Sequence, residues 1–117
     1  MQDKSEENWA VGQQCLMDSR LNAAANRLYY AVFQAVFEFA TKKRNYVSPG
    51  HSAHSSMLNI VRNYGKGRTK YGEVFNDLMG LRETADYDRE TPDKNDIENL
   101  LQDANAIRMY YLQQARN

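Results

Sequence analysis

The residues best suited to chemistry in this sequence are an arginine and an aspartate four positions apart, Arg82 and Asp86, followed directly by Tyr87. At that spacing in a helix two oppositely charged side chains lie on the same face and can form an ion pair, which contributes roughly 0.2–0.5 kcal/mol. The residue types alone leave two interpretations open: an ion pair that finishes a helix, or part of a ligand-binding cleft.

The other reactive residue types argue against a metal site and against a nucleophile. His51 and His54 can share one helix face, but no third ligand lies nearby in the sequence, so we expect no metal ion and no cofactor. Cys15 is followed by two apolar residues, which favours a packing role. The glycine-rich residues 65–68 lack the spacing and the Lys-Ser/Thr pair of a phosphate-binding loop, and they predict a turn.

These residues must be positioned by helices, and residues 22–41 predict the central one. At 100° per residue, the apolar positions cover a very wide arc: Ala25, Leu28, Tyr29, Val32, Phe33, Val36, Phe39 and Ala40. The narrow opposite stripe carries Arg27, Tyr30, Gln34, Glu38 and Thr41. A surface helix needs only one apolar face, so this arc predicts neighbours on several sides. The stretch is too short, and too interrupted by charge, to span a membrane.

Four further helices are predicted at about residues 3–17, from the Ser48-Pro49 pair to about 64, at 69–85 and at 92–115. Asn22 is a candidate cap for the central helix, and Thr91 followed by Pro92 predicts the cap and first position of the last helix. Residues 87–90 predict a polar loop. We therefore expect an all-α, up-and-down bundle of four to five helices that forms one domain over residues 1–117.

The overall charge excludes strong, non-specific attraction to nucleic acid or membranes. Fifteen Lys and Arg residues balance fifteen Asp and Glu residues, so the formal net charge is zero. Phosphate binding is then left to a local patch. The basic residues 42–44 and 66–70 are the places for such a patch, although the first run also suits the negative end of a helix dipole.

Cysteine content and the start of the chain bear on the compartment. A single cysteine excludes an internal disulfide and fits a reducing environment, so we expect a cytoplasmic protein. No apolar run follows the first residue, so we expect neither a signal peptide nor a membrane partner.

Three segments together resemble a known family. Residues 24–40 (AANRLYYAVFQAVFEFA) are similar to the "sRaYYAmFhAa" helix of small bacterial and archaeal HEPN-domain proteins, and residues 81–87 (LRETADY) resemble their "lR..ADY" segment. Between them, residues 54–57 (HSSM) are similar to the "tHsgv" start of the intervening helix. Their order and spacing make the chain most similar to stand-alone HEPN proteins, which are commonly paired with a minimal nucleotidyltransferase.

The resemblance implies a symmetric homodimer with a polar cleft where the two motif regions meet. It also implies a role with RNA or nucleotides, often within a toxin–antitoxin or defence pair. In the ribonuclease branch of the family, an arginine is followed four to six residues later by a histidine, and both act across the dimer cleft without a metal. The arginine would stabilise charge on the phosphate, and the histidine would move the proton of the 2′-hydroxyl.

The sequence departs from that ribonuclease pattern after Arg82. No histidine stands among the next residues, where Asp86 and Tyr87 are found instead. An aspartate beside an arginine is a poor base near neutral pH, and an ordinary tyrosine is poorer. His54, brought in from elsewhere in the fold, is the better substitute.

The leading hypothesis is a non-catalytic or weakly catalytic HEPN protein that binds nucleotide or RNA, with Arg82, Asp86 and Tyr87 lining the cleft. Arg27 can pair with Asp86 or contact a second phosphate. Tyr30, on the polar stripe, is a candidate for the cleft or the dimer interface, whereas Tyr29 is expected in the core.

Two alternatives come from other functional classes. The first is a metal-independent endoribonuclease toxin that uses Arg82 with His54 or Tyr87. The second is a purely structural, dimeric interaction module in which the central helix serves dimerisation alone.

Overall fold

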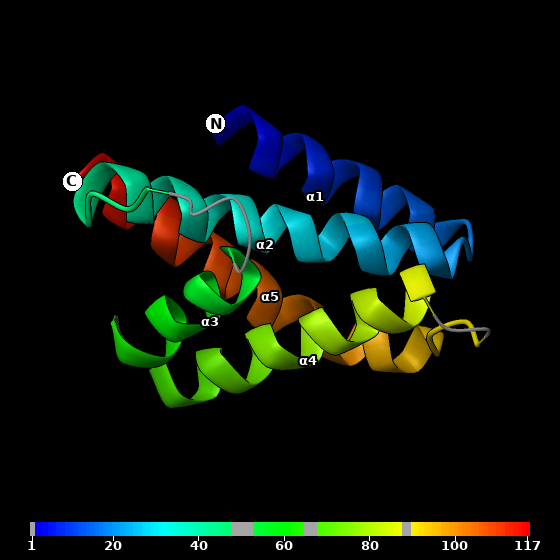
Figure 1. Cartoon of the computed structure of the whole chain (residues 1–117). Coiled ribbons are helices and arrows are strands. Elements are labelled where there is room, and N and C mark those ends of the chain that lie inside the picture. Colours follow the sequence, from blue (N-terminus) through cyan, green and yellow to red (C-terminus); the bar gives the residue numbers. More distant parts are fainter. Residues whose placement is uncertain (1, 48–52, 65–67, 88–89) are drawn as a thin grey trace.

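The apolar periodicity of the sequence becomes five helices in the computed structural model, which describes residues 2–47, 53–64, 68–87 and 90–117. They are α1 (Gln2–Met17), α2 (Leu21–Lys43), α3 (Ala53–Asn63), α4 (Arg68–Tyr87) and α5 (Lys94–Arg116). The four long helices alternate in direction along the chain, and the shorter α3 runs antiparallel to α4 (Figure 1). The described residues contain no strand. The predicted all-α bundle is confirmed.

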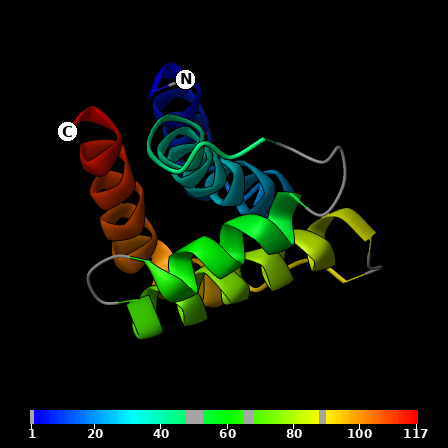
Figure 2. The same cartoon turned by 60° about the vertical axis from the view of Figure 1, so that its left-hand side comes forward.

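Helix α2 is the central element, as its wide apolar arc predicts. It contacts all four other helices. Figure 2 shows α1 and α2 side by side, with α3 and α4 forming a second layer and α5 along one side. Five alanines on α2 are almost inaccessible to solvent, and their small side chains let neighbouring helices approach closely: Ala24, Ala25, Ala31, Ala35 and Ala40. Position 38 on the predicted polar stripe is also buried, and the Glu38 carboxylate pairs there with Lys42 at 3.0 Å.

The turn between α1 and α2 forms without the predicted Asn22 cap. Ser19 adopts a left-handed conformation (φ 58°) just beyond α1. The Ser19 N–H donates to the Leu16 carbonyl at 3.1 Å, and the Arg20 N–H donates to the Cys15 carbonyl at 2.8 Å. This pair of bonds is a Schellman motif, which satisfies the last carbonyls of α1. The prediction was wrong because α2 already begins at Leu21 and its cap position, Arg20, makes no side-chain cap bond.

The cap of α5 is also shifted from its predicted place. Asp93 stands at the cap with an extended backbone, and its carboxylate accepts from the Asn95 N–H at 2.8 Å. The predicted Thr91 cap and Pro92 first position are therefore wrong. A carboxylate satisfies the same orphan N–H groups as a threonine hydroxyl, and its negative charge is also favourable at the positive end of the helix dipole.

The remaining predicted boundaries of helices and loops agree only in part with the structure. Helix α4 ends at Tyr87, so this residue finishes a helix and does not lie in the predicted loop. The Ser48-Pro49 start of the third helix lies outside the described residues, as do three of the four residues of the predicted turn at 65–68.

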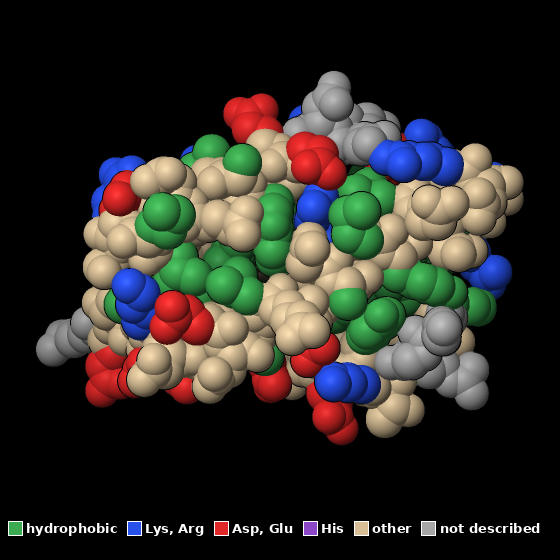
Figure 3. Space-filling model, turned by 180° about the vertical axis from the view of Figure 1, so that it is seen from behind, with side chains coloured by type: hydrophobic (Ala, Val, Ile, Leu, Met, Phe, Trp, Pro, Cys, Tyr) green, Lys and Arg blue, Asp and Glu red, His purple; other side chains and the backbone are tan. Residues whose placement is uncertain are grey.

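The surface mixes charges of both signs. In the view from behind, Lys and Arg side chains lie among Asp and Glu side chains, and hydrophobic side chains show between them (Figure 3). Among the described residues, no helix combines the length and the apolar character needed to cross a membrane.

Two glycines test how tightly the helices pack. A Cβ atom at Gly12 would lie 2.7 Å from the Leu28 side chain and 3.1 Å from its backbone nitrogen, whereas a Cβ at Gly80 would meet nothing within 4 Å. We expect Gly12→Ala to lower the free energy of unfolding by about 1 kcal/mol, because overpacking outweighs the gain in helix propensity. Gly80→Ala should raise it by about 0.5–1 kcal/mol. Urea denaturation measures both, and equal stability of the two variants would contradict the close α1–α2 contact.

Candidate functional site

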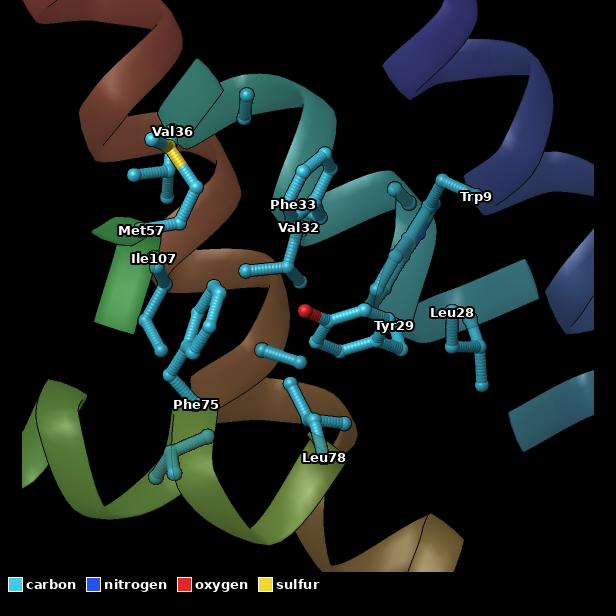
Figure 4. Close-up of a cluster of buried hydrophobic side chains, with 14 of the residues drawn as sticks. Trp9, Leu28, Tyr29, Val32, Phe33, Val36, Met57, Phe75, Leu78 and Ile107 are labelled. Atoms are coloured by element: carbon cyan, nitrogen blue, oxygen red, sulfur yellow. The ribbon is translucent and has the colours of Figure 1, made fainter. Parts of the chain in front are cut away.

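The candidate site is built around a tyrosine that belongs to the hydrophobic core. Tyr29 on α2 is 0% exposed and lies in the buried cluster that also contains Phe75 and Leu78 from α4 and Ile107 from α5 (Figure 4). Its ring makes an edge contact with Phe75 at a centroid distance of 5.6 Å. A buried hydroxyl must find a hydrogen-bond partner, because an unsatisfied one costs about 1–3 kcal/mol.

That partner is His54, in the first turn of α3. The Tyr29 hydroxyl and the His54 Nδ1 atom are 2.6 Å apart. Burial raises the pKa of Tyr29 well above its ordinary value of 10, so the phenol keeps its proton. Because this buried proton needs an acceptor, we assign the hydroxyl as donor to Nδ1. In the neutral ring the proton then resides on Nε2.

The His54 ring is held neutral by its surroundings. It lies 4.9 Å from the Phe33 ring and 5.9 Å from the Tyr30 ring, measured between centroids. Burial lowers the pKa of His54 from its ordinary value of 6.5, and the positive charge of Arg82 lowers it further, with partial opposition from Glu83. At neutral pH His54 is therefore uncharged and acts as a hydrogen-bond donor through Nε2.

Arg82 reaches the same tyrosines from α4. Its guanidinium carbon lies 5.7 Å from the centroid of the Tyr29 ring and 5.5 Å from that of Tyr30. Both distances are within the range of a cation–π contact. Its side chain is only 12% exposed, and its Nε atom is 3.3 Å from Asp86 Oδ2. The structure thus brings Arg82 and His54 together on one pair of aromatic rings.

Asp86 links α4 to α2 as well as holding Arg82. The Asn26 Nδ2 atom donates to its two carboxylate oxygens, at 3.3 and 3.2 Å. The predicted pairing of Arg27 with Asp86 is wrong: the exposed Arg27 donates instead to Asn8 Oδ1 on α1, at 3.2 Å. Adjacent residues on a helix point about 100° apart, so the rotation that buries Tyr29 turns Asn26, rather than Arg27, toward α4.

Of the two other candidate tyrosines, the structure describes the side chain of Tyr30 but not that of Tyr87. Tyr30 is half-buried and makes an edge contact with Tyr29 at 5.3 Å, so it forms part of the wall on which Arg82 lies. Tyr87 is the last residue of α4, one position beyond Asp86, and its side chain lies outside the described part of the chain.

The described residues offer no group of three or more His, Cys, Asp or Glu side chains that could hold a metal ion. A groove between α4 and α5 encloses about 540 Å³, and its polar lining includes Asn76, Asp77, Thr84 and Asp96. Its lining contains no Lys, Arg or His. The groove therefore offers no positively charged side chain to a phosphate group.

A comparison with known protein families shows to which family the chain is related. The model of the HEPN domain family matches residues 2–114. This chain belongs to the HEPN domain family. Comparisons with curated proteins and with solved structures gave no significant match.

Within this HEPN domain, the structure adds residues that the sequence did not assign to the site. The Tyr29 hydroxyl and the Asn26 amide were missed, because an apolar arc and a polar stripe do not reveal which neighbour each side chain meets. The adjacent tyrosines at positions 29 and 30 were the available signal. His54, proposed from the sequence as a substitute histidine, does lie beside the tyrosines that Arg82 contacts.

The charge of Arg82 should be visible in the titration of His54. Arg82→Gln is expected to raise the pKa of His54 toward 6.5 without reaching it, because burial is the larger cause of its lowering. An NMR titration of the ring signals, assigned with His54→Asn, measures the change, and Arg20→Gln, at an exposed position in the α1–α2 turn, serves as the control. An unchanged pKa in Arg82→Gln would contradict the proximity of the two side chains.

Proposed function

We propose that this HEPN domain binds the phosphate group of a nucleotide or RNA at the site formed by Tyr29, His54 and Arg82. The observation that carries the proposal is the meeting of the His54 ring and the Arg82 guanidinium over the two tyrosines. A largely buried arginine interacts with an anion more strongly than an exposed one, because less water screens its charge. His54 adds a neutral N–H donor beside it.

Asp86 and Tyr30 complete the proposed site. A guanidinium carries five N–H donors in a planar fork that suits phosphate oxygens, and Asp86 fixes this fork by its contact with Nε. Tyr30 offers a half-buried ring against which a base can stack. Tyr87 follows at the helix end, and the exposed Arg27 supplies a further cation on α2.

The same geometry favours binding over cleavage. A general base in RNA hydrolysis needs an unprotonated nitrogen that faces the 2′-hydroxyl. With the Tyr29 hydroxyl donating to Nδ1, the Nε2 atom of neutral His54 carries a proton and cannot take another. This arrangement supports a HEPN domain that holds its ligand and cleaves it poorly or not at all.

We also propose two partners. The resemblance in residues 24–40 and 81–87 supports a homodimer whose cleft contains the site. It also supports a minimal nucleotidyltransferase as the second member of a toxin–antitoxin or defence pair. In that pair the HEPN domain would present its nucleotide or RNA ligand within the cytoplasm.

Removing the charge at position 82 tests the site. We expect Arg82→Gln to weaken binding of ATP and of a 12-nucleotide RNA roughly 10- to 100-fold, the effect of losing one charge-assisted contact. Isothermal titration calorimetry provides the affinities, and Arg20→Gln, an exposed arginine in the α1–α2 turn, is the matched control. If the double variant Arg82→Gln/Asp86→Asn binds both probes like the wild type, the site assignment is lost.

A second candidate function, a metal-independent endoribonuclease, is favoured by one observation: His54 supplies a histidine near Arg82 that the sequence motif lacks. Cleavage of total cellular RNA in EDTA separates the two functions. We expect no cleavage by the wild type, because Nε2 of His54 is protonated. Cleavage that disappears in Arg82→Ala and in His54→Asn would establish the enzyme instead.

A further inference from the structure

One end of the bundle gathers four helix termini. The C-terminal ends of α2, α3 and α5 and the N-terminal end of α4 lie together there, on the left in Figure 1. The Tyr111 hydroxyl of α5 donates to the Tyr64 carbonyl at 2.6 Å, just beyond α3. The Arg44 guanidinium, at the end of α2, lies 3.8 Å from the centroid of the Tyr64 ring.

This end of the protein is rich in exposed cations. They are Lys42, Lys43, Arg44, Arg62, Lys70 and Arg116, and we call this set the basic end. Two of them are paired, Lys42 with Glu38 and Lys70 with Asp103 at 3.6 Å, and Glu73 is a further exposed acid on α4. Lys43, Arg62 and Arg116 form no ion pair with another described residue. The neutral net charge of the chain therefore conceals a local positive surface.

Tyr64 gives the basic end an aromatic surface on a fixed backbone. Its side chain is 41% exposed. Its N–H donates to the Ile60 carbonyl at 2.8 Å, and its own carbonyl accepts the Tyr111 hydroxyl. The stacked Arg44 guanidinium restrains the ring from one face. An aromatic ring of this kind, surrounded by cations, is the combination that binds a single strand, because every base can stack and every phosphate carries charge.

We propose that the basic end binds the phosphates of a single-stranded nucleic acid while Tyr64 stacks on one of its bases. This inference deepens the proposed function, since the strand would extend from the Tyr29–His54–Arg82 site. At 1.5 Å per helical residue, Tyr64 lies about 15 Å from His54 along α3, and Lys70 lies about 18 Å from Arg82 along α4. These spans equal about four to five nucleotide steps of 3.4 Å.

The test compares two charge-reversal variants with the same net charge. Lys43→Glu/Arg62→Glu alters the basic end, and Lys4→Glu/Arg20→Glu alters exposed cations elsewhere. Fluorescence anisotropy with a labelled 12-nucleotide single-stranded RNA is measured between 50 and 200 mM KCl. We expect the first variant to bind at least about tenfold more weakly at 50 mM and to reduce the slope of log K against log salt by about 1.4, since each lost phosphate contact accounts for about 0.7. The control should match the wild type.

A third variant distinguishes a nucleic acid strand from any polyanion. Tyr64→Leu should bind the 12-mer about tenfold more weakly, because it loses a stacked base, yet bind heparin and ATP like the wild type. Equal RNA binding by the two charge-reversal variants, or wild-type RNA binding by Tyr64→Leu, would overturn the inference. The proposed function is tested separately. If Arg82→Gln binds ATP with wild-type affinity, the proposed function is wrong, even if the basic-end variants no longer bind the 12-mer.

Discussion

The hydrogen bond between the buried Tyr29 hydroxyl and the His54 ring is the constraint on which the site depends. Tyr29 is fully enclosed by the core, so its hydroxyl requires an acceptor, and the His54 side chain at the start of α3 supplies one. Satisfying this core requirement also fixes the orientation of the His54 ring. Arg82 then lies over the same pair of aromatic rings. Packing of the core and chemistry of the site are therefore set by one residue.

This arrangement is possible because α2 can have neighbours on every side. Its buried alanines let α1, α4 and α5 approach closely, and Gly12 on α1 leaves no room for a side chain against Leu28. Close approach removes water from around Tyr29 and His54, which is why burial is the first cause of both shifted pKa values. A looser bundle would leave His54 with an ordinary pKa, and it would then be partly charged near neutral pH.

The sequence predicted the helices well because long apolar arcs specify both the period and the buried face. It failed where several residues could serve equally: Thr91 and Asp93 are both competent caps, and only the packed chain selects Asp93. The Arg82–Asp86 pair was predictable because the two residues are four apart on one helix. The sequence could not decide whether Arg27 or Asn26 is the partner of Asp86, because that choice depends on the rotation of α2 against α4.

Helix dipoles explain part of the charge distribution that the net charge conceals. Basic residues in the last turns of α2, α3 and α5 stabilise the negative ends of these helices, and the three ends meet on one side of the bundle. A basic end would thus arise from helix stability alone, whether or not it binds anything. The exposed Tyr64 ring has no such explanation, since capping needs charge and not an aromatic surface. The proposed binding of bases therefore rests on the tyrosine more than on the lysines and arginines around it.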